Sequence, residues 1–368
     1  MITLSAPQIV TPNAVLDDAW VTVDSGRIVA IGTGEPQGAS TQVDGALVPG
    51  FVDIHCHGGG GFSFDDPVAA TSAAEFHLGH GTTSMLASLV SAPVHDQVRL
   101  LSALRGVVSS GAVAGVHLEG PFLSLRYCGA QNPRALTDPS TADVDALLAA
   151  APGVLKLITI APELPGALDA IRRFADAGVV VAIGHSDCTA EEAQAAVAAG
   201  ATVVTHLFNA MRHFHHREHG LAEYALTDGR LATEVIADGI HLGDLALRVV
   251  ADTKRDRLIA VTDAMSAAGM PDGEYRLGGL DVTCADGAAR LTGTSTLAGS
   301  TLTMDRAFSH LHNVIGLDLG ATAHACATEP ARALGLSDVG CIEVDKQADF
   351  VVWKDGVQAV FKNGIKVH

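Results

Sequence analysis

The sequence predicts an α/β protein, in which a (β/α)₈ TIM barrel carries a small β-sandwich domain built from both termini. Three observations support this fold class. Apolar strand-like runs alternate with helical patterns through the middle of the chain. Short runs of alternating polarity, separated by turn residues, occupy both ends. Polar side chains gather where the predicted barrel strands end. We expect the domain boundaries to divide the chain into residues 1–49, 50–340 and 341–368.

Eight apolar runs predict the barrel strands, over residues 47–55, 82–86, 113–119, 155–160, 179–185, 202–206, 232–238 and 258–263. Helical patterns fill several intervals, over residues 140–151, 164–177 and 190–199. The last helix should start with a capping box, since Thr189 is followed three residues later by Glu192. A doubly wound open sheet is the alternative, but no G-x-G-x-x-G follows any run. The pattern therefore favours a barrel.

The terminal segments alternate apolar and polar residues around turn sequences. Residues 19–23 and 27–31 flank a turn at 24–26, and residues 349–354 and 357–362 flank Asp355-Gly356. Both ends of the chain have this alternating pattern and the middle does not. We therefore expect one small sheet domain assembled from the two termini.

The composition restricts the classes of partner. The 368 residues carry a formal net charge of −18, which would repel nucleic acid and anionic membranes. A hydrophobic fraction of 48% argues against disorder. The chain has 17 His against 2 Trp and 3 Tyr, and His is the commonest metal ligand in proteins. An acidic, His-rich chain suggests a metal enzyme.

We expect neither a signal peptide nor a membrane-spanning segment. The N-terminus lacks the basic and apolar regions of a signal peptide, and no apolar run is long enough to span a membrane. The six cysteines contain no C-x-x-C pair, so we expect them to be reduced and mostly packed as small hydrophobic residues. We therefore expect a cytoplasmic protein.

Metal-ligating residue types stand at the ends of the predicted strands: His55, His57, Glu119, His185, His206 and Asp263, with His241 after the seventh strand. In His55-Cys56-His57, strand alternation places both imidazoles on one face and turns Cys56 away. Each His alone could be a core residue with one hydrogen bond. Together they predict a divalent metal site with nitrogen and oxygen ligands, which suits Zn and tolerates Fe, Mn or Co.

A metal at this rim would favour hydrolysis, which needs a general base. Asp263 is the candidate base, although it could instead be a plain metal ligand. His241 could hydrogen-bond a substrate carbonyl and stabilise the oxyanion. Cys128 lies in a loop after the third strand and is a weak catalytic candidate, because no base partner is evident.

Longer motifs resemble the metal-dependent amidohydrolase superfamily. They are the approach to the first strand, VDGALVPGFVDIHCHG, and the return segment DKQADFVV. Within this superfamily, HLEGPF (117–122), GHS (184–186), THLFNAM (205–211), ADGIH (237–241) and VTDAM (261–265) resemble the N-acetylglucosamine-6-phosphate deacetylases. The resemblance covers essentially the whole chain. It implies hydrolysis of the acetamide of N-acetylglucosamine 6-phosphate to glucosamine 6-phosphate and acetate, in amino-sugar catabolism and cell-wall recycling.

The resemblance also implies roles for individual residues. Glu119, His185 and His206 would hold the main metal, while His55 and His57 would hold a second, bridged by Glu119 with Asp263 nearby. Two divalent metals per subunit are thus implied. Asp263 would be the general base and acid, and His241 the contact to the N-acetyl carbonyl. The implied substrate contacts are Ala130, Gln131, Asn209, Ala210, Arg217, His241 and Leu297, with Arg217 reaching the neighbouring site of a homodimer.

Two loops depart from the family pattern, so selectivity among N-acetylated hexosamine phosphates is open. Residues 212–220 read RHFHHREHG, where the family often has Pro before the Gly, and Gln131 stands where a His is frequent. We interpret the His-rich run as a solvated loop with one or two phosphate contacts, not a further metal site. Residues 273–299 read as hairpins that could form a flap at the barrel mouth.

Two other functions remain possible from the sequence. A cyclic-amide hydrolase would bridge its metals with a modified Lys at the end of strand four, but Lys156 lies too early in that strand. A catalytically silent sugar-phosphate sensor could use the same barrel, although the complete ligand set and Asp263 argue against it.

Overall fold

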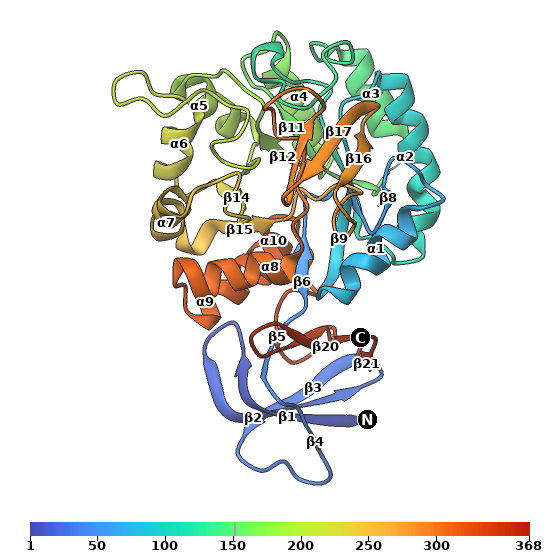
Figure 1. The fold of residues 1–368 in the computed structure, drawn as a ribbon, viewed down its shortest axis with the longest axis vertical. Helices are drawn as coiled ribbons and strands as arrows, with labels where there is room; N and C mark the ends of the chain where they lie inside the picture. The colour runs from blue at the N-terminus through green and yellow to red at the C-terminus, as the bar shows by residue number, and fades with distance from the viewer. Residues whose placement is uncertain (151) are drawn as a thin grey trace.

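The computed structural model describes residues 1–150 and 152–368. Two bodies are visible, a barrel surrounded by helices and a smaller sheet that holds both termini (Figure 1). The predicted fold class is confirmed. The residue boundaries proposed for the domains stay a prediction.

The barrel sheet contains eight parallel strands in sequential order. They are β6 (Phe51–Asp53), β9 (Thr82–Leu89), β10 (Gly115–Glu119), β11 (Leu155–Ile160), β12 (Val180–Ile183), β13 (Val203–Val204), β14 (Ala232–Ile236) and β15 (Leu258–Val261). Each lies within or over one of the eight predicted runs. The strand interiors are buried almost throughout, as a parallel sheet covered on its outer face requires.

One side-chain and one backbone hydrogen bond link the first and last segments of the barrel. Asp53 Oδ2 accepts a hydrogen bond from Thr262 Oγ1 at 2.6 Å, and the Asp263 amide donates to the His55 carbonyl at 2.8 Å. Burial raises the pKa of Asp53 to about 6, although its hydrogen bonds with Thr262 lower it. The closure therefore lies immediately below the predicted site residues.

The first predicted strand is wrong in one respect, because residues 47–55 do not form a continuous strand. β5 (Ala46–Pro49) belongs to the terminal sheet and β6 to the barrel, with Gly50 between them. A Cβ on Gly50 would lie 2.3 Å from Thr83 Oγ1, so only glycine fits where the chain passes between the two bodies.

Helices enclose the barrel: α1 (Ala70–Gly79), α2 (Val94–Ser109), α3 (Thr141–Ala150), α4 (Ala167–Asp176), α5 (Ala190–Ala199), α6 (Leu221–Thr227), α7 (Asp244–Thr253), α8 (Met304–Ser309), α9 (Leu319–Ala323) and α10 (Glu329–Ala333). π-helical turns extend α8 over His310–Ile315 and join α9 to α10 over His324–Thr328.

The predicted capping box of α5 is confirmed, since Thr189 and Glu192 exchange both bonds. The predicted helix over 140–151 corresponds to α3, and position 151 lies outside the described residues. The helix predicted over 164–177 begins later, because Gly166 has a φ of 83°.

The terminal sheet has eight strands and combines the two chain ends as expected. It contains β1 (Ile2–Val10), β2 (Val15–Asp24), β3 (Arg27–Thr33), β4 (Thr41–Gln42), β5, β19 (Phe350–Trp353), β20 (Val357–Lys362) and β21 (Ile365–Lys366), in the order β21-β20-β19-β5-β1-β2-β3 with β4 beside β1. The sheet curls around a core of its own, to which both ends contribute.

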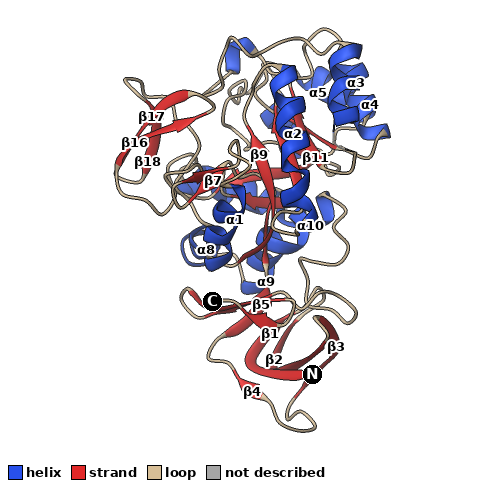
Figure 2. Cartoon of the chain, turned by 90° about the vertical axis from the view of Figure 1, so that its right-hand side faces the viewer, coloured by secondary structure: helices blue, strands red, loops and turns tan. Residues whose placement is uncertain are grey.

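A three-stranded hairpin sheet of β16 (Gly273–Leu277), β17 (Leu280–Ala285) and β18 (Ala288–Leu291) follows β15. It stands out from one side of the barrel in Figure 2, and a short ribbon of β7 (Gly58–Gly59) and β8 (Phe62–Ser63) follows β6. We call β16–β18 the flap. The flap has its own apolar cluster, which includes Met265 and packs against Val90 and Ala130, and this cluster fixes it to the loops of the barrel mouth.

Candidate metal centre and active site

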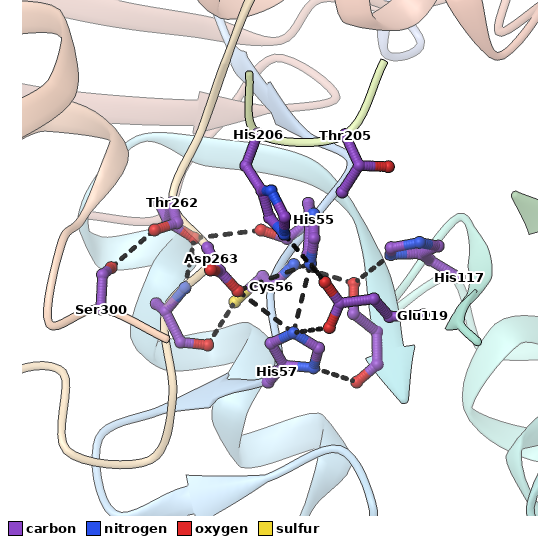
Figure 3. Close-up of polar contacts among 12 residues, drawn as sticks. His55, Cys56, His57, His117, Glu119, Thr205, His206, Thr262, Asp263 and Ser300 are labelled. Carbon is purple, nitrogen blue, oxygen red and sulfur yellow. Dashed lines mark hydrogen bonds and ion pairs between the residues drawn. The ribbon is translucent and has the colours of Figure 1, made fainter. Parts of the chain in front are cut away.

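His55 and His57 follow β6 and point to the same place, as strand alternation predicts. Their Nε2 atoms lie 3.2 Å apart (Figure 3). His55 Nδ1 lies 3.1 Å from Glu234 Oε2, and His57 Nδ1 lies 3.1 Å from the Ser88 carbonyl. Both oxygens accept hydrogen bonds, so each ring donates through Nδ1 and directs the lone pair of Nε2 into the site.

His185 and His206 follow β12 and β13 and form a second pair. Their Nε2 atoms are 3.1 Å apart, and His185 Nδ1 lies 3.0 Å from the Tyr127 carbonyl. Their backbones have φ values of 48° and 26°, in the left-handed region that non-glycine residues seldom adopt. Such conformations persist where the surrounding structure holds them, often at functional sites.

Glu119, the last residue of β10, lies between the two pairs. Its Oε1 is 2.9 Å from His185 Nε2, 3.1 Å from His206 Nε2 and 3.5 Å from His55 Nε2. Its Oε2 is 3.3 Å from His57 Nε2. Two buried groups with metal-ligand geometry result, His55–His57–Glu119 and Glu119–His185–His206, and they share one carboxylate.

The donor chemistry of these groups fits divalent cations. Three of the four rings have Nδ1 against an oxygen acceptor, so their Nε2 lone pairs converge on each other and on a carboxylate. Buried lone pairs about 3 Å apart repel unless positive charge lies among them. Imidazole nitrogen and carboxylate oxygen are the ligands that Zn and similar metals use.

The pKa values of the imidazoles and of Glu119 also indicate that positive charge is favoured in this cluster. Burial would lower the pKa of His55, yet Glu119 and Asp263 raise it well above its usual value. Burial likewise opposes protonation of His57, and Asp263 and Glu119 still raise its pKa to about 9. Burial would raise the pKa of Glu119, but His55 and His185 hold it well below its usual range.

Asp263 follows β15 and faces the first pair. Its Oδ1 lies 3.2 Å from His57 Nε2 and 3.5 Å from His55 Nε2. The residue has a φ of 49°, and its carbonyl accepts from the Ser300 amide at 2.7 Å. Burial would raise its pKa, but His55 and His57 lower it, so the carboxylate is ionised and able to accept a proton.

His241 is fixed by a residue that the sequence reasoning left without a role. Asp238 Oδ2 lies 2.7 Å from His241 Nδ1, and Asp238 Oδ1 accepts from the amide of His241 at 2.8 Å. Burial would raise the pKa of Asp238, but its hydrogen bond with His241 lowers it. Because Nδ1 is occupied, Nε2 of His241 remains for a substrate. The D-x-x-H spacing in ADGIH is the signal that could have identified this pair.

Glu234 is a second functional residue that the sequence reasoning missed. It lies in the apolar strand β14 and is fully buried. Its Oε2 accepts from His55 Nδ1 and also from the His206 amide at 3.3 Å, so it supports both pairs. Glu234 could have been identified from the sequence as a carboxylate in the middle of an apolar strand, because a buried carboxylate needs a partner.

A cavity of about 380 Å³ opens above these residues. It is lined by most of the predicted site: His57, Glu119, Ala130, Gln131, His185, His206, Asn209, Ala210, His241, Asp263 and Leu297. His55 lies deeper, beneath the cavity floor. The flap adds Leu277, Arg290 and the loop 295–299 to the wall, so the hairpins do flank the barrel mouth as expected.

Two predicted substrate contacts, Arg217 and Gln131, have different surroundings. Arg217 is exposed on its loop and does not line the cavity of its own chain. Gln131 lines the cavity but also bonds inside the site, since its Nε2 donates to Glu119 Oε2 at 2.6 Å and its Oε1 accepts from the Ser91 amide at 2.7 Å. Gln131 therefore positions the shared carboxylate.

The remaining His and Cys residues lie outside the candidate ligand groups. In the loop 213–219, His215 Nδ1 accepts from the backbone amide of Glu218 at 3.0 Å, and the other imidazoles are exposed. Cys56 faces away from the site, 3.2 Å from His77 Nε2, as alternation predicts. All six cysteines are unpaired. Among the described residues, no helix is both long and apolar enough to cross a membrane.

A barrel with imidazole and carboxylate ligands at the carboxyl ends of its strands has the architecture of a metal-dependent hydrolase. The pattern of the amidohydrolase family matches residues 46–367, and the chain belongs to this family. The predicted resemblance is therefore confirmed. Members of this superfamily depend on divalent metal ions.

Individual relatives are deacetylases of phosphorylated amino sugars. The chain is 35% identical to N-acetylgalactosamine-6-phosphate deacetylase of Escherichia coli O157:H7, over 98% of both chains. It is 34% identical to N-acetylglucosamine-6-phosphate deacetylase of Bacillus subtilis strain 168, over 94% of this chain and 91% of the relative. It is also similar to a mutant of the Mycobacterium smegmatis N-acetyl-D-glucosamine-6-phosphate deacetylase solved with N-acetyl-D-glucosamine-6-phosphate, at 40% identity and a TM-score of 0.97, covering 100% and 99% of the chains.

Proposed function

We propose that this protein is a metal-dependent hydrolase that removes the acetyl group from N-acetyl-D-glucosamine 6-phosphate. The products are D-glucosamine 6-phosphate and acetate, which places the reaction in amino-sugar catabolism and cell-wall recycling. The observation that carries the proposal is the carboxylate of Glu119 shared by two buried His pairs, beneath a cavity that contains Asp263 and His241. The named deacetylases among its relatives support the substrate class.

We propose two divalent metal ions per subunit, with Zn favoured and Fe, Mn or Co able to replace it. His185, His206 and Glu119 would hold one ion, and His55, His57 and Glu119 the other, with Asp263 beside the second. When bound, divalent ions in such a site polarise the substrate carbonyl and lower the pKa of water.

The protein's own residues would then move the protons. Asp263 is ionised and faces the cavity, so it can take the proton of the attacking water and return it to the leaving amine. His241 can donate from Nε2 to the carbonyl oxygen as negative charge develops there, while Asp238 stabilises the charged imidazole.

The phosphate would lie against Asn209 and Ala210, with Ala130, Gln131 and Leu297 around the sugar. Arg217 is exposed and does not line the cavity of its own chain. We propose that it reaches the partner's site in a homodimer. We keep both the homodimer and a cytoplasmic location as proposals.

N-Acetylgalactosamine 6-phosphate is a second candidate substrate. The E. coli relative named for that activity matches this chain end to end. The two sugars differ only at the C4 hydroxyl, and the loop that carries Gln131 departs from the family pattern. A cyclic-amide substrate is disfavoured, because no Lys is among the described residues that line the cavity.

Acetate release by the purified, metal-loaded protein tests the proposal, with both sugar phosphates assayed and metal content measured by elemental analysis. Asp263→Asn should lower kcat by about 10³-fold or more while metal content stays near that of the wild type. A metal-replete wild type that releases no acetate would refute the function. An Asp263→Asn variant with normal kcat would refute the assignment of the base.

A further inference from the structure

The cavity wall contains one strongly basic side chain that no role above uses. Arg290 lies on β18 of the flap and is the single Lys or Arg among the described residues lining the cavity. The rest of the charged or titratable lining is His57, Glu119, His185, His206, His241 and Asp263. A guanidinium stays charged at all physiological pH values, so Arg290 gives this wall a permanent positive charge.

The structure around Arg290 holds it at the cavity. Its neighbour Ala289 is buried in the flap cluster, and Arg290 pairs in an isolated bridge with Leu297, which lines the same cavity. Arg290 Nη1 donates to the Ser295 carbonyl at 2.9 Å. One of the five N–H donors is thus used to fix the side chain, and others remain for a ligand.

Neighbouring carboxylates do not neutralise this charge. Glu274 is on the same face of the flap, since it lies opposite Thr283, which lies opposite Arg290. Its oxygens accept instead from Thr283 Oγ1 at 3.0 Å and from Thr292 Oγ1 at 3.2 Å. None of the ion pairs among the described residues includes Arg290, whereas Arg276 of the same flap pairs with Asp281 at 3.4 Å.

We infer that Arg290 binds the phosphate group of the substrate and sets the requirement for a phosphorylated sugar. The inference rests on the proposed function. A phosphate monoester must enter a protein of net charge −18 and approach a cavity that already contains two carboxylates. Arg matches phosphate with paired hydrogen bonds and opposite charge. Arg290 is supplied by the same chain, so this contact does not depend on a partner subunit.

The test compares Arg290→Ala and Arg290→Lys with a matched control, Arg276→Ala, which removes an exposed arginine from the same sheet. Kinetics are measured with N-acetylglucosamine 6-phosphate and with unphosphorylated N-acetylglucosamine. Arg290→Ala should raise KM for the phosphorylated sugar about 10- to 100-fold with kcat within about twofold. The unphosphorylated sugar should react at an unchanged rate. Arg290→Lys should be intermediate, and Arg276→Ala should match the wild type.

Calorimetric titration with inorganic phosphate provides a readout that needs no turnover. Binding should weaken about tenfold in Arg290→Ala and be unchanged in Arg276→Ala. If the wild type binds phosphate through Arg290 but releases no acetate, the proposed function fails while Arg290 keeps its role as a phosphate-binding residue. If Arg290→Ala behaves like Arg276→Ala, or slows both sugars equally, the inference is refuted.

Discussion

His55 and His57 both follow one strand, β6, whereas His185 and His206 follow two neighbouring strands, β12 and β13. The first pair converges through ordinary strand alternation, and both of its rings are fixed by acceptors at Nδ1. The second pair converges through left-handed backbone, and Nδ1 of His206 has no hydrogen-bond partner among the described residues. The first pair is therefore held by side-chain contacts, and the second depends more on the path of the chain.

The imidazoles of the two pairs are therefore held in place in different ways. Glu234 and Ser88 orient the first pair from behind, so changes there should act on metal affinity. The second pair has fewer such contacts to lose. Glu119 belongs to both groups, so its substitution should have the largest effect. Smaller effects should follow at Glu234, His77 and Gln131, in that order.

Glu119→Gln should have the largest effect, because it removes the one ligand that both pairs share. The neutral amide also leaves four converging imidazoles without their buried counter-charge. We expect kcat/KM to fall by about 10³-fold or more and metal content to fall at both sites. Elemental analysis and acetate release measure this. Glu274→Gln on the flap is the control, and a Glu119→Gln protein with full metal content would contradict the shared-ligand arrangement.

Glu234→Gln should act mainly on the His55 and His57 pair. The substitution keeps the shape of the side chain but replaces the charged acceptor of His55 Nδ1. Loss of such an outer contact weakens metal binding about 10- to 100-fold. Competition titration with a chelator should show one weakened site and one near wild-type affinity. Equal weakening of both sites would show that the His206 amide contact of Glu234 matters as much as the His55 contact.

His77 should make the folded protein sensitive to acid. It is fully buried, and its Nε2 lies 2.9 Å from the Gly58 carbonyl, next to His57. Burial lowers its pKa from 6.5 to about 4. Between these two pH values the unfolded chain binds a proton that the folded chain does not, so stability falls as pH falls, by up to about 3 kcal/mol.

Denaturant unfolding at several pH values tests this effect. His77→Gln should be less stable than the wild type at pH 8 because of imperfect packing, but its stability should change less between pH 6.5 and 4. His216→Gln, at an exposed position away from His77, is the control. An unchanged pH dependence in His77→Gln would assign the acid sensitivity to other groups.

Gln131→Leu should have the smallest effect of the four. It removes the donor to Glu119 Oε2 and leaves the Ser91 amide without its acceptor, while Glu119 keeps its contacts with four imidazoles. We expect kcat to fall about 3- to 10-fold with both metals retained. The ratio of rates on the gluco and galacto substrates should also change, because Gln131 lines the cavity. A variant with wild-type kcat on both sugars would show that Gln131 does not contribute to catalysis.

The sequence was most informative where local rules decide the structure. The capping box of α5, the strands β19 and β20 and the orientation of His55, Cys56 and His57 all follow from capping or alternation within a few residues. The eight barrel strands could also be located, because parallel strands buried on both faces form continuous apolar runs. The candidate ligand residues could be proposed because polar side chains stand at the predicted strand ends.

Contacts between distant segments could not be predicted in this way. Glu234 reaches His55 across 179 positions, and Gln131 reaches back to Glu119 only because its loop folds over the mouth. The break at Gly50 depends on Thr83 of the next strand. Arg290 became a candidate only when the flap was placed against the cavity. These positions require the tertiary structure, since each partner is chosen by the fold and not by its neighbours in sequence.

The passage through Gly50 has a consequence for engineering. Pro49 ends a strand of the terminal sheet and Phe51 begins a barrel strand, which leads within a few residues to His55. The Gly50 amide bonds to the Asp349 carbonyl at 2.9 Å, so the two chain ends are joined at the point where the barrel strand begins. The terminal sheet is therefore not a removable module. A shortened protein cut at this boundary would expose the start of the strand that positions His55 and His57. The loop tips of the sheet, far from the mouth, are better positions for a tag or insertion.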